Sequence, residues 1–462
     1  MDKLAGSSGD DKTPFRSRKR ARSALDGGGC SLPGGGLNHR GTIRDWANLG
    51  DGPAGHIADL ALANDVADYV RFRAVCRPWR RCSPDPRAAG LDARFLPRHW
   101  IMLENAFAGP RRRFFNVRTG ECIRTDLPLL AYRRHLFALP TECLGMDLPL
   151  LPLLTLTTEG LLLLLHEPTH TLRLLNPLTL QLTRLPPVTA LLRPDQQEAM
   201  ARGSELRDMI RVCAASIIVA AGGAPIVAVT FYNPMALAVA KPGDETWAAI
   251  DHRDRLDITN SLPFRGRLYC ASRLGVMVLD NISSGQPRLV MAAEWIKKPF
   301  YLCPMSASLH LVDNGGELML VHRELLPMDY TDEDEDEDDD DDDDEEEEEE
   351  HHNHDEDDDR QTYSRNYQVY RVDLDAGILI PAVKINGRAV FMGMTRTISV
   401  SPEAFPFLTA DTIYLGSDCD SEISGYNLVD GSREPCNYGS CYPSSMVECL
   451  CCCIKGTGKL LA

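Results

Sequence analysis

Most motifs that identify common enzyme classes are missing from this 462-residue sequence. There is no G-x-S-x-G nucleophile turn, no Walker phosphate loop and no G-x-G-x-x-G after a predicted strand, and no HExxH zinc-binding helix is predicted. These motifs position nucleophiles, metal ligands or phosphate-binding amides. We therefore expect a protein that is not an enzyme and that uses no cofactor and no catalytic metal.

The sequence also lacks an apolar leader and an uninterrupted membrane-spanning run. Its first residues, MDKLAGSSGDDKTPF, contain no apolar core of a signal peptide, so we expect its 15 cysteines to stay reduced. Residues 212–240 carry no charge, but Gly222-Gly223, Pro225 and Asn233-Pro234 interrupt them. This pattern favours strand–turn–strand over a spanning helix. We expect no membrane association and a location in the nucleus and/or cytoplasm.

Negative charge is concentrated in one segment. The formal charge is −18, but residues 332–359 contain 24 acidic residues and no Lys or Arg. Without them 43 acids remain against 49 Lys and Arg, which is a formal charge of +6. The acidic segment, with His351, His352 and His354, is predicted to be a solvated loop. It is a passive insertion, an attractant for basic proteins, or a loose metal trap.

Residues 1–40 are polar and glycine-rich, and we predict that they are disordered. Within them lies the sequence RSRKRAR. Its residues Arg18, Lys19, Arg20 and Arg22 suit the acidic grooves of a nuclear import receptor, and the alternative is a solvated basic tail without an address function.

Residues 46–82 are predicted to form two short helices. Pro53 suits a first helical turn, and Asn64-Asp65, with Asp68 three residues on, predicts the N-cap of the second helix. Because Pro78 has no N–H to donate, we expect that helix to end or kink just before Trp79. Residues at steps of three and four form its apolar stripe: Val66, Tyr69, Phe72, Cys76 and Trp79.

The segment DYVRFRAVCRPWRRC (68–82) resembles the end of an F-box, although Gly52-Pro53 stands where Leu-Pro is usual. The matching residues are Arg71, Arg73, Val75, Cys76, Trp79 and Arg80. The resemblance implies binding to a Skp-type adaptor of a cullin ubiquitin ligase. The residues expected to contact that adaptor are Pro53, Ile57, Leu60, Val75, Cys76 and Trp79. The alternative is an ordinary amphipathic helical hairpin.

From about residue 98 onward, short apolar runs alternate with turn residues, which predicts strands. The leucine runs at 150–165 are also interpreted as strands, because Pro and Thr interrupt them. Only residues 194–211 show helical spacing. Strand–turn units repeat at tens of residues, which favours roughly six or seven propeller blades.

Five later segments resemble, in order, the C-terminal β-propeller domain (KIB type) of plant F-box proteins. They include NPLTLQLTRLPP, YQVYRVDLDAGILIPAVKINGRAVFMG and TIYLGSDCDSEISGYNLVDG. The expected fold is mainly β, with a short F-box-like helical segment before the propeller. The expected divisions are a tail at 1–40, helices at 41–97, a propeller at 98–455 with an insertion at 331–362, and a tail at 456–462.

Two functions remain open. In one, the F-box-like helices bind the adaptor and cullin complex while the propeller presents an unknown protein substrate. In the other, the propeller is a non-enzymatic nuclear scaffold whose acidic loop binds basic proteins. Nucleic acid is not an expected partner in either. The cysteines at 436–453 do not form two clear pairs, so reduced thiols are favoured over zinc.

Overall fold

The structure is a computed structural model. It describes residues 46, 49–88, 90–102, 111–127, 137–138, 152–153, 155–157, 159–219, 223–233, 236–250, 258–282, 286–297, 307–327, 363–393, 396–406, 408–415, 420, 423–435 and 450. Residues 47–462 belong to one compact unit. The predicted import segment at 16–22, the insertion at 331–362 and the cysteines at 436–453 lie outside the described residues.

Three helices open the described chain: α1 (Asp51–Asn64), α2 (Val66–Val75) and α3 (Arg77–Arg81). The predicted cap is present, because the Asp65 side chain accepts a hydrogen bond from Ala67 N at 2.7 Å. The second helix ends at Val75, and Cys76 adopts an extended backbone. Pro78 then lies in the first turn of α3, where no intrahelical N–H is needed. The break predicted before Trp79 therefore falls at Cys76.

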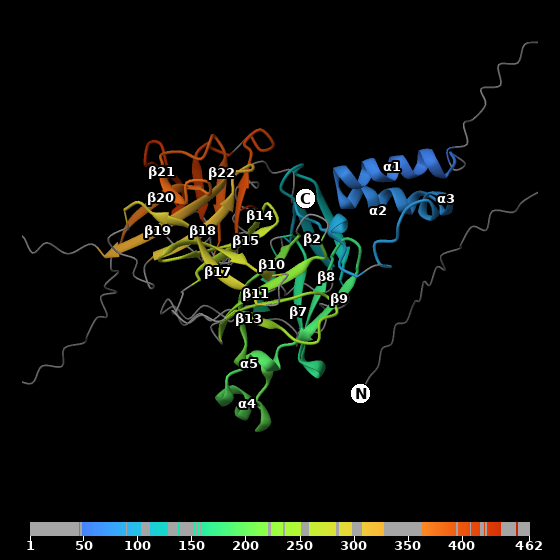
Figure 1. Cartoon of the computed structure of the whole chain (residues 1–462). Coiled ribbons are helices and arrows are strands. Elements are labelled where there is room, and N and C mark those ends of the chain that lie inside the picture. Colours follow the sequence, from blue (N-terminus) through green and yellow to red (C-terminus); the bar gives the residue numbers. More distant parts are fainter. Residues whose placement is uncertain are drawn as a thin grey trace, which may run out of the picture. The chain divides into compact units, whose positions relative to one another are not determined.

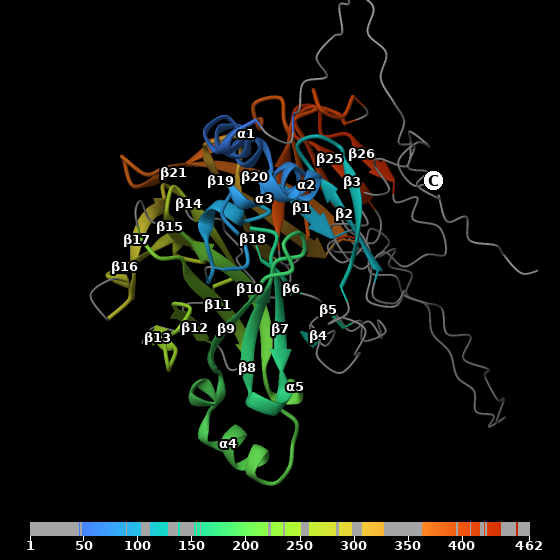
Figure 2. The same ribbon diagram turned by 90° about the vertical axis from the view of Figure 1, so that its right-hand side faces the viewer.

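Most of the remaining elements are antiparallel sheets (Figures 1 and 2). Sheet 1 contains β1 (Trp100–Met102), β2 (Arg111–Asn116) and β3 (Cys122–Asp126). Sheet 2 contains β6 (Thr155–Leu156), β7 (Leu162–His166), β8 (Thr171–Leu175) and β9 (Leu182–Pro187). Sheet 3 contains β10 (Arg211–Ile218), β11 (Ile226–Asn233), β12 (Ala236–Ala240) and β13 (Ala248–Ile250). A short pair joins β4 (Phe137–Ala138) to β5 (Pro152–Leu153).

Sheet 4 contains β14 (Asn260–Phe264), β15 (Arg267–Ser272), β16 (Gly275–Asp280) and β17 (Arg288–Trp295). Sheet 5 contains β18 (Ala307–Asp313), β19 (Leu318–Pro327), β20 (Tyr363–Asp373) and β21 (Ile378–Ala382), and a short parallel pairing of β17 with β21 joins it to sheet 4. Sheet 6 contains β22 (Ala389–Met392), β23 (Thr397–Val400), β24 (Thr412–Leu415), β25 (Ile423–Asn427) and β26 (Arg433–Pro435).

Each sheet packs on the next, and the last packs on the first. Separate buried clusters join sheets 1 and 2, 2 and 3, 3 and 4, 4 and 5, and 5 and 6. A sixth cluster places Phe391 of sheet 6 against Ile101 and Phe115 of sheet 1. The described sheets therefore close a ring of six blades, within the predicted range of six or seven.

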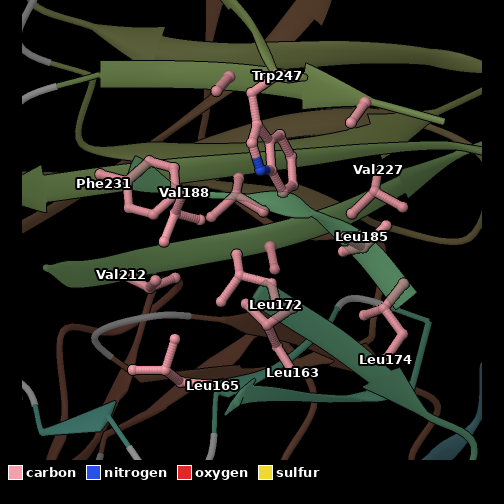
Figure 3. Packing of buried hydrophobic residues seen from close by; sticks show 14 of the residues in the cluster. Leu163, Leu165, Leu172, Leu174, Leu185, Val188, Val212, Val227, Phe231 and Trp247 are labelled. Atoms are coloured by element: carbon pink, nitrogen blue, oxygen red, sulfur yellow. The ribbon is translucent and has the colours of Figure 1, made fainter. Parts of the chain in front are cut away.

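The leucine run in β7 shows why these strands are apolar on both faces. Leu163 and Leu165 face sheet 3, whereas Leu162 and Leu164 face sheet 1. Figure 3 shows Leu163 and Leu165 on the side of Val212, with Trp247 closing the other end of the same cluster. A strand between two sheets buries both of its faces, so it does not show the polar alternation of a one-sided sheet.

Two other expectations from the sequence are confirmed. The uncharged residues at 212–240 form β10, β11 and β12, so the strand–turn–strand interpretation holds. The segment with helical spacing forms α4 (Pro194–Ala201) and α5 (Leu206–Met209), next to the cluster between sheets 2 and 3.

Candidate interaction surfaces

The helical segment is fastened to sheet 1 through Asp65. Its carboxylate accepts hydrogen bonds from Trp100 Nε1 at 2.9 Å and from Asn116 Nδ2 at 3.1 Å, in addition to capping α2. Ala67 joins the apolar cluster between sheets 1 and 2, and Arg71 pairs with Glu121. The helices therefore have a defined position against the edge of sheet 1 (Figures 1 and 2).

Two arginines of the F-box-like motif hold the helical segment together. The Arg73 guanidinium donates to the carbonyl of Arg80 at 3.0 Å and to the carbonyl of Pro84 at 2.8 Å. Arg80 Nε donates back to the Arg73 carbonyl at 3.0 Å. These bonds tie α2 to α3 and to the chain that follows. The motif thus has an internal structural role.

The residues predicted to bind an adaptor fall into two groups. Ile57, Leu60 and Val75 are exposed, at 38%, 58% and 62%, and Pro53 is exposed with them. Cys76 and Trp79 are half-buried. The Trp79 ring stacks on Phe72 with centroids 4.7 Å apart, inside the segment's own small core.

The first helix turns its larger apolar residues outward. Ala54 and Ala58 are buried against the second helix's core, at 3% and 1% exposed. Pro53, Ile57 and Leu60 are four and three residues apart, so they share another face of α1, and that face is exposed. Leu62 is partly buried against the same core, but Pro53, Ile57 and Leu60 remain on a face that a helix enclosed by its own core would cover.

A second candidate surface is a cavity of about 780 Å³ at one end of the ring. Every sheet contributes to it through a strand, a hairpin end or an adjoining segment, for example Val117, Glu159, Ile217, Leu262, Asp313 and Ile398. Five arginines also line it: Arg98, Arg118, Arg265, Arg388 and Arg396. None of these residues was predicted from the sequence, because they come from segments that are far apart in the chain.

The same ends of β1 and β2 contact both the cavity and the helices. His99 and Val117 line the cavity, and their sequence neighbours Trp100 and Asn116 donate to Asp65 at the start of α2. Desolvation by the surrounding walls and the positive charges of Arg118, Arg98 and Arg396 lower the pKa of His99, while the carboxylate of Asp65 acts in the opposite direction. The start of α2 and the rim of the cavity are therefore close together.

Two sequence matches to catalytic motifs have no matching geometry. Residues 166–170 have the sequence HEPTH, which matches HExxH. The expectation that the chain has no metal site did not take this match into account. They lie on the β7–β8 hairpin, where His166 Nδ1 is 2.7 Å from Thr169 Oγ1. The two histidines of a zinc-binding HExxH must lie one turn apart on a helix. Residues 50–55 fit G-x-G-x-x-G but follow no described strand.

No group of three or more potential metal ligands occurs within the described residues. Among the helices in the described part of the chain, none is both long and apolar enough to cross a bilayer.

Comparison with known proteins gives one extensive match. Residues 114–438 match the model of a family described as KIB1-4 beta-propeller. No curated protein matches significantly. Together with the ring of sheets, the family match confirms the predicted mainly β fold, in which helices precede a β-propeller.

Two solved structures are similar over part of the chain. One is dihydro-heme d1 dehydrogenase NirN in complex with DHE, at 17% identity over 50% of this chain and 42% of that chain, with a TM-score of 0.22. The other is the β-propeller domain of Myceliophteria thermophila Cps50 (Swd1), at 13% identity over 54% and 71% of the two chains, with a TM-score of 0.23. At these scores neither bears on function.

Proposed function

Because this chain belongs to the KIB1-4 β-propeller family, we propose that it is the substrate-recognition subunit of a Skp–cullin–F-box ubiquitin ligase. In this proposal α1 to α3 bind a Skp-type adaptor, and the propeller binds a protein substrate. The chain supplies positioning and no catalysis of its own. In this proposal the protein acts in the nucleus or the cytoplasm.

The exposed apolar face of α1 is the observation that carries this proposal. Pro53, Ile57 and Leu60 form a stripe that the propeller does not cover, and the exposed Val75 lies in the same helical segment. Exposed apolar residues grouped on one helix mark a surface for another protein more often than scattered single ones do. An amphipathic helix that inserts its apolar residues into a groove is a common recognition mode.

The fixed attachment of the helices supports the same role. Asp65 links the start of α2 to Trp100 and Asn116 of sheet 1, beside the rim of the cavity. An adaptor bound to α1 would therefore keep a constant position relative to a substrate bound by the propeller. A ligase subunit needs this property, because its substrate must reach a distant catalytic site.

One observation favours the alternative, a nuclear propeller scaffold whose acidic segment binds basic proteins. The stripe of α2 is already buried within the chain, with Tyr69 0% and Phe72 6% exposed. The helices would then be only a structural cap on sheet 1. The two functions differ in whether α1 has a partner.

Copurification tests the proposal. The variant Ile57→Ser/Leu60→Ser should lower recovery of a Skp-type adaptor and cullin at least about tenfold, because two apolar anchors are lost. The control is Val383→Ser/Val429→Ser, which removes two side chains that are 79% and 68% exposed on the propeller and should leave recovery unchanged. Trp79→Ala would also disturb the helical segment itself, because Trp79 packs on Phe72. Equal adaptor recovery by the Ile57/Leu60 variant and the unchanged protein would overturn the adaptor role.

A further inference from the structure

We propose that the arginine-lined cavity binds an anionic segment of the protein substrate, with carboxylate or phosphate groups held between the arginines. This inference rests on the proposed function and names the class of substrate. It follows from the construction of the cavity, the charges in its wall and the absence of partners for two of its arginines within the described structure.

The cavity is formed by closure of the ring. Its wall includes the β2–β3, β14–β15 and β18–β19 turns and Arg396, the residue just before β23. Closure of the ring brings these turns together, although they are spread over some three hundred residues of sequence. A volume of about 780 Å³ is sufficient for several residues of an extended peptide.

The charges in the wall are unbalanced. Five arginines line the cavity, together with two acidic residues, Glu159 and Asp313. Both acids already accept backbone hydrogen bonds: Glu159 Oε2 from Ile217 N at 2.8 Å, and Asp313 Oδ1 from Gly316 N at 2.7 Å. With the histidine neutral, the lining carries three net positive charges, which makes it attractive for an anion.

Three of the arginines are held in place by the wall. Arg388 donates through Nε to Ser399 Oγ at 2.6 Å, and Ser399 Oγ donates onward to Asn314 Oδ1 at 2.7 Å. Arg265 donates to the Gly316 carbonyl at 2.9 Å, and Arg396 donates to the Thr157 carbonyl at 3.3 Å. Carbonyl and hydroxyl acceptors orient the guanidinium groups of Arg388 and Arg265 without neutralising them, whereas Arg396 also interacts with the negative charge of Glu159. The positive charge is therefore preorganised.

Arg98 and Arg118 are the two arginines left for a ligand. Both are exposed, and neither side chain has a hydrogen bond or ion pair within the described residues. Arg98 precedes β1 and Arg118 follows β2, at the same end of this antiparallel pair, and both of their charges lower the pKa of His99. Both residues line the same cavity, and a guanidinium group can contact a planar carboxylate or a phosphate in a bidentate manner.

A peptide fits this wall better than a nucleic acid does. The arginines converge in one hollow instead of forming a stripe that could follow a sugar–phosphate backbone. Apolar residues with at least partly exposed side chains, such as Val117, Pro263 and Ala404, also line the cavity and can contact the neighbouring side chains of a peptide. Clusters of arginine are a known means of recognising acidic or phosphorylated motifs.

Fluorescence anisotropy with three labelled peptides of one sequence tests the inference. One carries a Glu/Asp run, one carries phosphoserines at the same positions, and one carries Ser there. The protein is used as the full chain and as a variant without residues 332–359, so that its own acidic segment cannot hide the site by competition. We expect one or both anionic peptides to bind at about 0.15 M salt, and the Ser peptide not to bind. The peptide that binds identifies carboxylate or phosphate as the ligand.

Arginine variants locate the site. The variant Arg98→Gln/Arg118→Gln should weaken binding of the anionic peptide at least about tenfold, since two charge-assisted contacts are lost. Arg202→Gln/Arg433→Gln removes the same charge at exposed positions outside the cavity, and affinity should be retained. Absence of binding in both protein forms, equal weakening by both variants, or equal competition by heparin would overturn the inference.

The outcome is separable from that of the proposed function. The Arg98/Arg118 variant should still copurify with the adaptor, and the Ile57/Leu60 variant should still bind the peptide. Loss of adaptor binding alone would leave the cavity as a peptide site of a scaffold. Loss of peptide binding alone would leave the adaptor role in place.

Discussion

Gly160 lies in the turn between β6 and β7, beside the cavity residue Glu159. Its φ of +81° lies in the left-handed region, where a Cβ is strained. A Cβ at this position would stand 2.2 Å from the Pro97 carbonyl oxygen and 3.0 Å from that of Trp100. Both are backbone atoms of the segment that joins the helices to sheet 1. A single absent methyl group thus permits close contact between sheets 1 and 2.

Gly160→Ala should therefore lower the free energy of unfolding by about 2 kcal/mol or more, because strain and a backbone clash act together. The matched control is Gly52→Ala in the first helix, where nothing lies within 4 Å of the added Cβ. That change should be neutral or slightly stabilising, since Ala favours helix. Thermal unfolding of both variants is the measurement. Equal midpoints for the two would contradict the predicted role of Gly160.

At the scale of single elements, the β18–β19 hairpin buries two histidines on opposite faces. His322 packs edge-on against Trp295, and burial lowers its pKa to about 4. Burial and the nearby charge of Arg323 lower the pKa of His310 to about 3. Neither nitrogen of the His322 ring has a hydrogen-bond partner within the described residues. The folded hairpin therefore favours the neutral form of both histidines.

This hairpin should make the protein sensitive to acid. In the unfolded chain these histidines bind protons below about pH 6.5, whereas the folded chain does so only near their lowered pKa values. The stability that neutral His322 contributes is fully present above pH 6.5 and is lost as pH falls toward 4. From pH 7.5 to 5 this loss is about 2 kcal/mol for His322.

The variant His322→Phe should reduce that loss, because Phe fits among the same apolar neighbours and binds no proton. Urea unfolding of the unchanged protein and the variant at pH 7.5 and 5 measures the difference. The variant should also be no less stable at pH 7.5, since it removes buried polar atoms without partners. An unchanged pH dependence in the variant would show that His322 is not the group responsible.

At the scale of the whole molecule, the acidic segment between β19 and β20 decides the net charge. Deleting residues 332–359 changes it from −18 to +6. If the segment is a passive insertion, one of the three interpretations left open by the sequence, the deletion should leave the thermal midpoint and adaptor recovery unchanged, because a solvated loop adds no core. Attraction for basic proteins should fall, mainly at low salt.

Pulldowns at low and at moderate salt check this prediction. A basic partner that is lost above about 0.15 M salt indicates charge capture without specificity. If the deletion abolished the main partner while the Ile57/Leu60 variant had no effect, the scaffold function would replace the ligase function.

The sequence by itself determined the secondary structure and the class of fold. Strand runs bounded by Gly, Pro and Asn, the cap at Asp65 and the break near Pro78 all depend on near neighbours, whose preferences the local pattern records. The same holds for the uncharged segment at 212–240, where breakers favour strands over a helix.

Only the tertiary structure decided which surfaces are available. Trp79 continues the apolar stripe of α2 in the sequence, yet it packs on Phe72, while Leu60 of α1 remains outside. Arg98 and Arg396 are almost three hundred residues apart, and nothing near either of them in the sequence marks it as part of a cavity. Closure of the ring brings them together, and that closure depends on packing between whole sheets. Local sequence patterns cannot record such long-range contacts.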